Sequence, residues 1–125
     1  MIKWNMLSQK VFEICGENVY ACYQCGKCSA GCPMADKMDI LPNQIVRLVQ
    51  LGEVSVLDSN AIWMCTSCFT CTLRCPRNVD VASIIDALRQ VTLRRGVDAV
   101  KPRQVRRVGE YPQIALVAAF RKLTG

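Results

Sequence analysis

The sequence has no histidine, few aromatic residues and no long apolar run. Histidine is the side chain that most often moves protons near neutral pH, and no other set of acid, base and nucleophile stands out, so we expect no catalytic residues here. The longest apolar run, Ile114 to Phe120, has seven residues, whereas a membrane-spanning helix needs about 20. The sequence therefore predicts neither a self-contained enzyme nor a transmembrane segment.

Charged residues are also scarce, at 21% of the chain, below the roughly 25% of an average soluble domain. A surface with few charges leaves apolar patches exposed, and such patches are usually covered by other proteins. We therefore expect this chain to be one member of a hetero-oligomer.

Cysteine, by contrast, is abundant, and eight of the nine cysteines form two runs with identical spacing. Each run reads C-x2-C-x2-C-x3-C-P, the ligand pattern of bacterial-type proteins that hold two [4Fe-4S] clusters. The pattern predicts two such clusters as cofactors and electron transfer as the function. The runs consist of Cys22, Cys25, Cys28 and Cys32, and of Cys65, Cys68, Cys71 and Cys75.

The chemistry of the cofactor explains the spacing. A cubane needs one thiolate on each of four irons, and intervals of two residues let one loop reach three of them. In two-cluster ferredoxins the cysteine before the proline binds the other cluster. Gly26 and Gly31 are expected to let the first loop approach its cluster closely. The predicted ligand sets are therefore exchanged: Cys22, Cys25, Cys28 and Cys75 for one cluster, and Cys65, Cys68, Cys71 and Cys32 for the other.

Paired cysteines also occur in structural zinc sites, so a zinc-holding interaction module is the alternative from a different class of protein. Zinc usually takes four ligands from two separated pairs, often with histidine. Four cysteines in each run, the prolines after them and the lack of histidine favour iron and sulfide. A disulfide scaffold fits less well, because Met1–Lys10 lacks the apolar segment of a secretion signal and thiolate clusters belong to reducing compartments. We expect a cytoplasmic protein.

Three residues near the runs have interpretations of their own. The ninth cysteine, Cys15, falls on the apolar face of an expected helix, where it would be a small buried hydrophobic residue. Trp63 and Phe69 flank the second run and are expected to shield its cluster from water, since solvent exposure is one factor that sets the reduction potential.

The formal net charge of +6 changes once the cofactors are counted. An oxidised [4Fe-4S] core with its four thiolates carries roughly −2, so two clusters lower the net charge to about +2. Basic residues gather from Arg89 onward, but no aromatic residues alternate with the arginines, as a stacking platform for nucleic acid requires. We predict a solvated face or a docking surface for an acidic partner, and no nucleic acid partner.

Apolar periodicity predicts helices, and few segments alternate with the period of two that strands require. Pro42 begins one expected helix, Asp80 caps the longest, and a residue among 58–60 caps the turn before Cys65. The predicted fold is all-α, with two cysteine-rich cluster-binding loops. The expected helices cover residues 7–15, 42–51, 61–64 and 81–95, with glycine ending the first, second and fourth.

Several segments closely resemble the C subunit of heterodisulfide reductase. The similarity runs from about residue 8 to residue 96 and continues in RKLTG at the end of the sequence. The segments that carry it are ACYQCGKCSAGCP at 21–33, MDI at 38–40, LVQLG at 48–52, IWMCTSCFTC at 62–71, RCP at 74–76 and VD at 79–80.

The resemblance implies an α-helical ferredoxin, related in fold to the iron–sulfur subunit of succinate dehydrogenase. It further implies a relay that carries electrons from a flavin- and cluster-bearing A subunit to a cysteine-rich B subunit, which reduces the disulfide of coenzyme M and coenzyme B in methanogenesis. An alternative within this class is the iron–sulfur subunit of a glycolate oxidase-like or anaerobic glycerol-3-phosphate dehydrogenase-like enzyme. In those enzymes the cluster domain is usually fused to a cysteine-rich acceptor domain.

The predicted domains are a cluster domain, 1–96, and a basic, then apolar, C-terminal arm, 97–125. Within the arm, Tyr111 to Leu123 is apolar in nearly every direction around a helix. We predict that this segment docks on a partner subunit, with Arg103, Arg106 and Arg107 flanking the contact. The alternative is that it folds onto the cluster domain as a core helix.

Overall fold

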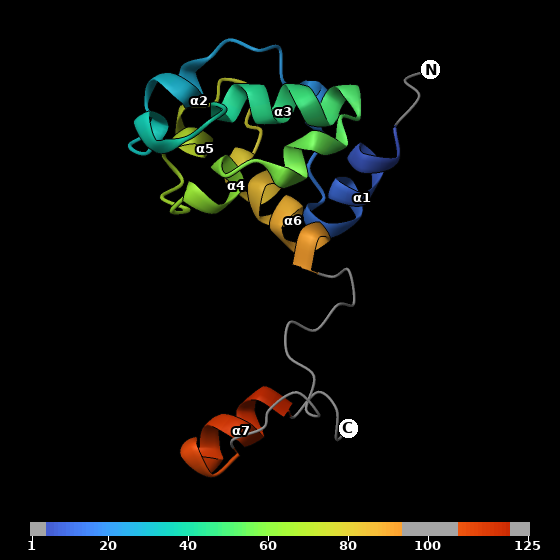
Figure 1. The fold of residues 1–125 in the computed structure, drawn as a ribbon. Coiled ribbons are helices and arrows are strands. Elements are labelled where there is room, and N and C mark those ends of the chain that lie inside the picture. The colour runs from blue at the N-terminus through green and yellow to red at the C-terminus, as the bar shows by residue number, and fades with distance from the viewer. Residues whose placement is uncertain (1–4, 94–107, 121–125) are drawn as a thin grey trace. The chain divides into compact units, whose positions relative to one another are not determined.

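The structure of the chain is a computed structural model, and it describes residues 5–93 and 108–120. Within these ranges every regular element is an α-helix or a 3-10 turn, and no strand is present (Figure 1). The prediction of an all-α fold is therefore confirmed. The chain divides into two compact units, Met1–Arg95 and Gly96–Gly125.

The first unit carries both cysteine runs. None of the helices in the described ranges has the length and apolar content that crossing a membrane would require. The α-helices of the first unit are α1 (Met6–Cys15), α2 (Lys27–Ala30), α3 (Pro42–Leu51), α4 (Ala61–Met64), α5 (Thr70–Arg74) and α6 (Val81–Leu93), and its 3-10 turns are η1 (Val19–Ala21), η2 (Ala35–Lys37) and η3 (Val54–Asp58). The second unit contains η5 (Val108–Glu110) and α7 (Gln113–Phe120).

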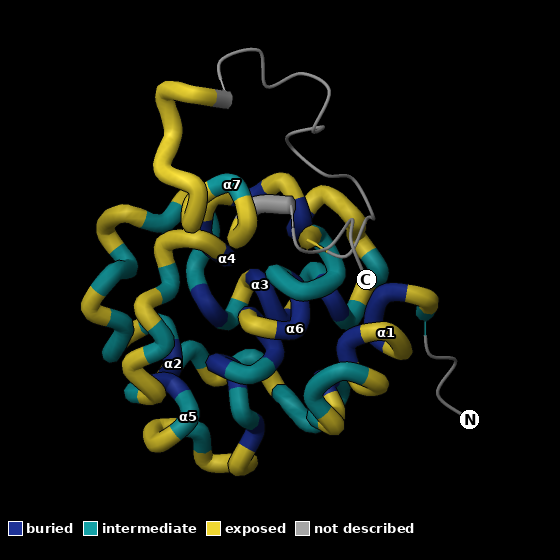
Figure 2. Tube along the Cα trace, turned by 90° about the horizontal axis from the view of Figure 1, so that it is seen from below, coloured by how far each residue is buried: buried dark blue, intermediate teal, exposed yellow. Residues whose placement is uncertain are grey.

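The core of the first unit lies between α1, α3 and α6, which pack on one another (Figure 2). Burying a large aliphatic side chain contributes about 1.5–3 kcal/mol, so the facing stripes of α3 and α6 supply much of the stability of this unit. The buried faces have the helical periodicity from which the sequence predicts these two helices, and Leu48 and Val91 beside them are partly buried. The buried residues are Ile45, Val46 and Val49 in α3, and Ile84, Ile85 and Leu88 in α6.

The predicted helix ends are also confirmed where they are described. Pro42 is the first residue of α3, and Gly52 follows its end with a φ of 80°. Gly16 ends α1 in the same left-handed conformation, with a φ of 74°. Asp80 caps α6, since its carboxylate accepts hydrogen bonds from the Ser83 amide at 3.0 Å and hydroxyl at 2.7 Å. The expected part of this helix after Leu93 lies outside the described residues.

The first unit consists of two similar halves. In each half a short helical turn, η1 or α4, ends directly before the first cysteine of a run, and a longer helix, α3 or α6, follows the run. Both longer helices bury their fourth, fifth and eighth residues. The doubled sequence motif therefore corresponds to a doubled structural unit.

Asn5 joins the start of α1 to the end of α3. Its side-chain oxygen accepts a hydrogen bond from the Ser8 amide at 2.7 Å, while its amide nitrogen donates to the carbonyls of Val49 at 3.0 Å and Gln50 at 2.9 Å. Gly52 leaves room for it, because a Cβ at this position would lie 2.9 Å from Asn5 Cγ. One side chain thus binds backbone groups at the ends of two helices.

We expect Asn5→Ala to lower the free energy of unfolding by about 1–2 kcal/mol, because α1 loses its N-cap and two carbonyls of α3 lose a donor. Asn5→Ser is the matched control: its hydroxyl can still cap α1 but it has no amide to donate to the carbonyls of α3, so it should fall between the wild type and Asn5→Ala. Thermal unfolding of the anaerobic holoprotein, followed by circular dichroism, measures both. Equal midpoints for the wild type and Asn5→Ala would contradict this role.

Candidate iron–sulfur centres

The two cysteine runs have the same backbone conformation at equivalent positions. Two residues after the first cysteine, Gln24 and Ser67 have φ values of 63° and 54°. Two residues further on, Gly26 and Phe69 have φ values of 78° and 59°. A residue in the left-handed conformation turns the chain sharply, as a loop around a compact group requires. Glycine adopts this conformation at little cost. In the second run the same turn is made by Phe69, at a cost of roughly 1–2 kcal/mol.

The two runs face each other through α2 and α5, which pack together. Cys28 in α2 and Cys71 in α5 are each 8% exposed and lie close enough for their thiols to interact. Gly31 and Arg74, which both precede the fourth cysteine of a run, also meet: a Cβ on Gly31 would lie 2.6 Å from Arg74 Nη1. Equivalent residues of the two runs thus lie near each other, and Gly31 makes room for an arginine of the other run.

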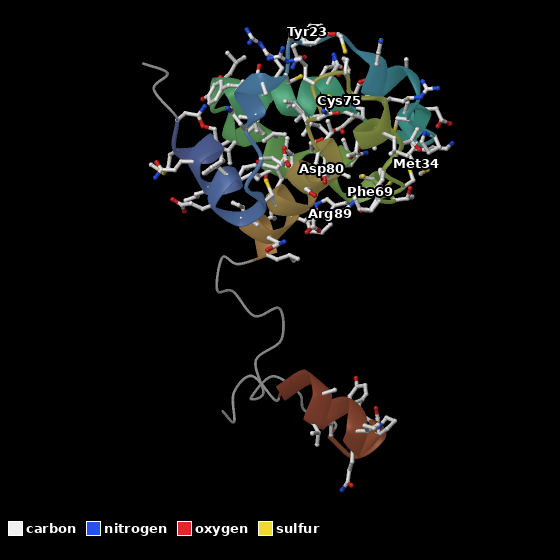
Figure 3. All side chains as sticks on the ribbon, turned by 180° about the vertical axis from the view of Figure 1, so that it is seen from behind. Tyr23, Met34, Phe69, Cys75, Asp80 and Arg89 are labelled. Carbon is white, nitrogen blue, oxygen red and sulfur yellow. The ribbon has the colours of Figure 1, made fainter. Side chains whose placement is uncertain are left out.

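One cavity of the first unit is lined by cysteines from both runs. Cys32, the last cysteine of the first run, lies there with Cys65, Cys68 and Cys71 of the second. An apolar lining of this kind lowers the access of water to a bound cofactor. Figure 3 labels two of the lining residues, Met34 and Phe69. The others are Pro33, Met38, Pro42, Thr66, Thr70, Ala82 and Ile85.

Cys75, the last cysteine of the second run, lies near the first run. Figure 3 labels Tyr23 of the first run and Cys75, and Cys25, Cys75 and Arg77 are all close enough to Tyr23 to act on its pKa. Partial desolvation, hydrogen bonding to Cys25 and the nearby thiols raise the pKa of Tyr23, and Arg77 offsets part of this rise. The Cys75 sulfur also accepts a hydrogen bond from the Val79 amide at 3.3 Å.

The chemistry of the thiols fits the predicted cofactor. Burial raises the pKa values of the Cys28 and Cys71 thiols, and neighbouring cysteines raise them further. A hydrogen bond with Thr70 lowers the pKa of the exposed Cys68 thiol. Buried thiolates this close together need a compensating positive charge, which a bound metal provides by deprotonating its thiol ligands outright. An all-sulfur ligand set selects iron–sulfur clusters or zinc.

Iron–sulfur clusters and zinc make different demands on the thiolates. A zinc site needs four ligands around one ion, whereas in a cubane each thiolate binds a different iron. In the two described ranges, no group of three or more cysteine or acidic side chains is placed to hold a single metal ion.

Asp39 holds α4, the turn that leads into the second run. Its carboxylate accepts hydrogen bonds from the Ser59 hydroxyl at 2.7 Å and from the amides of Ala61 at 3.0 Å and Asn60 at 3.2 Å. These bonds, first of all the one from Ser59, hold the pKa of Asp39 below its usual value. Ser59 also accepts from the Ala61 amide at 3.1 Å, whereas Asn60, at the N-cap position, makes no side-chain capping bond. Asp39 carries no such signal in the sequence, because the residues that it holds at the start of α4 lie at least 20 positions away.

Two polar side chains that bind the cysteine loops also carry no signal in the sequence. Gln50 in α3 donates a hydrogen bond to the carbonyl of Cys22, and Arg89 in α6 donates to the carbonyl of Cys65. No motif or periodicity marks a polar residue on a helix as a ligand of a distant carbonyl. Both residues therefore became visible only in the structure.

Cys15 and the aromatic residues can also be placed. The Cys15 thiol, half-buried against the core, donates to the Val11 carbonyl at 3.1 Å, and burial raises its pKa. This is the packing role expected from its helical face. Phe69 lines the cavity and is 50% exposed, whereas Trp63 is 46% exposed and is not one of the cavity-lining residues.

Comparison with known proteins adds to this geometry. Residues 18–79 match the family described as 4Fe-4S dicluster domain, which confirms two [4Fe-4S] clusters as the cofactors. The chain is 42% identical over 90 residues to the C subunit of "Ferredoxin:CoB-CoM heterodisulfide reductase" from Methanosarcina acetivorans, covering 72% of this chain and 36% of the relative. It is 41% identical over 88 residues to the iron–sulfur C 2 subunit of "CoB--CoM heterodisulfide reductase" from Methanocaldococcus jannaschii, covering 70% of this chain and 47% of the relative. The chain thus spans about half the length, or less, of these two relatives.

Proposed function

Because this chain is a relative of the C subunit of heterodisulfide reductase and carries a 4Fe-4S dicluster domain, we propose that it relays electrons within a heterodisulfide reductase-type complex. The observation that carries the proposal is the convergence of the two runs, with Cys32 beside Cys65, Cys68 and Cys71 around one cavity. Thiolate ligands from both runs tie the halves of the unit together and set the two clusters close to each other.

We further propose that the exchanged ligand sets hold the two clusters. The position of Cys32 in the cavity and that of Cys75 near Tyr23 of the first run support this pairing. When bound, each cluster accepts and releases one electron at a time. The chain itself contributes the thiolates, the hydrogen bonds that hold the loops, and the apolar side chains that limit the access of water.

The proposed partners are a protein like the flavin- and cluster-bearing A subunit, which donates electrons, and a protein like the cysteine-rich B subunit, which reduces a disulfide. The names of the relatives, all subunits of such reductases, support this assignment. The chain has no catalytic set of its own and depends on these partners for substrate chemistry. The proposed location is the cytoplasm, where thiolate clusters are maintained.

The proposal also assigns the C-terminal arm, 97–125, to partner docking. In α7, Ile114 is 79% exposed and Val117 is 69% exposed. A helix that is apolar on every side is stable in water only when another surface covers it. The basic residues proposed to flank the contact, Arg103, Arg106 and Arg107, lie outside the described residues.

Metal analysis tests the proposed function directly. Protein purified without oxygen should hold about eight iron and eight sulfide per chain, since each cubane contributes four of each. It should also show the electron paramagnetic resonance (EPR) signals of reduced [4Fe-4S] clusters after treatment with dithionite. Two zinc ions per chain with negligible iron would falsify the relay and support the interaction module instead.

A further inference from the structure

In each half of the first unit, a side chain of the longer helix donates hydrogen bonds to two carbonyls at the cysteine run. The donor is neutral in one half and positively charged in the other. In the first half, Gln50 Nε2 donates to the carbonyls of Val19 at 2.7 Å and Cys22 at 3.0 Å. These carbonyls belong to the first cysteine of the run and to the residue three positions before it. The donor is a neutral amide.

In the second half, the donor is a cation. The Arg89 guanidinium donates from Nε to the carbonyl of Ile62 and from Nη2 to the carbonyl of Cys65. Ile62 and Cys65 occupy the positions in the second half that the two carbonyl residues occupy in the first. The two donors are also equivalent, because Gln50 is the ninth residue of α3 and Arg89 is the ninth residue of α6.

The charge of Arg89 has no carboxylate to neutralise it within the described part of the chain. There, the only ion pair joins the exposed side chains of Lys37 and Asp36. Arg89 is half-buried and lies one helical turn after Ile85, which lines the cavity together with Cys65. Asp86, three residues before Arg89 in α6, forms no ion pair with it, so the negative charge that the guanidinium approaches is the thiolate-ligated centre of Cys65, whose carbonyl it binds.

We infer that Arg89 is a positioning residue that also raises the reduction potential of the cluster held by Cys65, Cys68 and Cys71. This inference rests on the proposed function. Reduction by one electron takes a cluster with four thiolates from roughly −2 to −3. A nearby positive charge stabilises the more negative form more strongly, and screening is weak at a half-buried site. Gln50 gives the first loop the same support through a neutral amide, and the cation that binds its side-chain oxygen, Arg47, is exposed, so water and salt screen its charge.

Replacing Arg89 separates the charge from the support. In Arg89→Gln, one of the two midpoint potentials should shift to a more negative value while the other stays constant. Arg89→Lys keeps the charge but not the two-pronged donor, so its midpoint should stay closer to that of the wild type. Lys10→Gln, on the exposed side of α1, removes the same charge at a distance and should leave both midpoints unchanged. An anaerobic redox titration followed by EPR measures all of them.

The reverse change tests the inference with Arg89 left in place. Gln50→Arg should shift the other midpoint to a more positive value, and it decides the question if Arg89→Gln loses its cluster. Unchanged midpoints in Arg89→Gln with full iron content, an equal shift in Lys10→Gln, or no positive shift in Gln50→Arg would overturn the inference. The iron content of the wild type distinguishes a failure of this inference from a failure of the proposed function, because a zinc protein would have no midpoint potentials to compare.

Discussion

Cys75→Ser should destroy the cluster held by Cys22, Cys25 and Cys28, although these residues lie more than 40 positions earlier in the sequence. Cys75 lies close enough to Tyr23 of the first run to act on its pKa, and a serine hydroxyl is a much poorer ligand for iron than a thiolate. The iron content of the anaerobically purified variant should fall from about eight toward about four per chain. The cluster held by Cys65, Cys68 and Cys71 should remain.

Two reference variants show which cluster is lost. Cys25→Ser and Cys68→Ser each remove a ligand from one run only, and both cysteines are exposed. The EPR spectrum of reduced Cys75→Ser should match that of Cys25→Ser and differ from that of Cys68→Ser. Cys15→Ser is the matched control, because Cys15 binds the Val11 carbonyl and packs on the core, and it should keep all of the iron. A spectrum of Cys75→Ser that matches Cys68→Ser would exclude the exchange of ligands.

The features that sequence analysis predicted correctly are local ones. Pro42 and Gly52 bound α3 because proline suits the first turn of a helix and glycine the left-handed residue after it. The apolar periodicity of α6 predicts its buried face, since that periodicity is the helix repeat itself. The cluster motif likewise depends on spacing within a short segment, so it can be read without knowledge of the fold.

The features that it missed depend on contacts between distant segments. Asp39 and Arg89 bind backbone groups more than 20 residues away, and no pattern in the sequence specifies which carbonyl or amide a polar side chain will meet. Phe69 illustrates a different limit. Glycine at position 26 signals a left-handed residue, but a phenylalanine with a φ of 59° carries no such signal, because bulky residues rarely adopt that conformation.

Strain at Phe69 can persist because the surrounding loop fixes it. The two runs share their backbone conformation, and the loop can hold three ligands only if it turns at this position as it does at Gly26. A phenyl ring at the cavity then shields the site, which glycine could not do. The cost of roughly 1–2 kcal/mol for such a residue therefore falls at a functional position, as strain in folded proteins often does.

Truncation after Gly109 should release the chain from its partner subunits without removing its clusters. The removed segment contains α7, with Ile114 and Val117 exposed. Both cysteine runs and the buried core belong to the first unit. The first unit should therefore keep about eight irons per chain. The shortened chain should no longer bind its partners, because it lacks the apolar helix that a partner would cover.

Affinity purification of the tagged chain from its own cells, under anaerobic conditions, measures this effect. The full chain should carry along proteins that contain flavin and additional iron, and the truncated chain should not. A chain shortened only by removal of residues 121–125 is the matched control, because it keeps α7 (Gln113–Phe120) and should retain its partners. Loss of iron from the chain truncated after Gly109 would instead mean that α7 completes the core of the cluster domain. Deleting a segment removes the clusters only if they depend on that segment for burial or support.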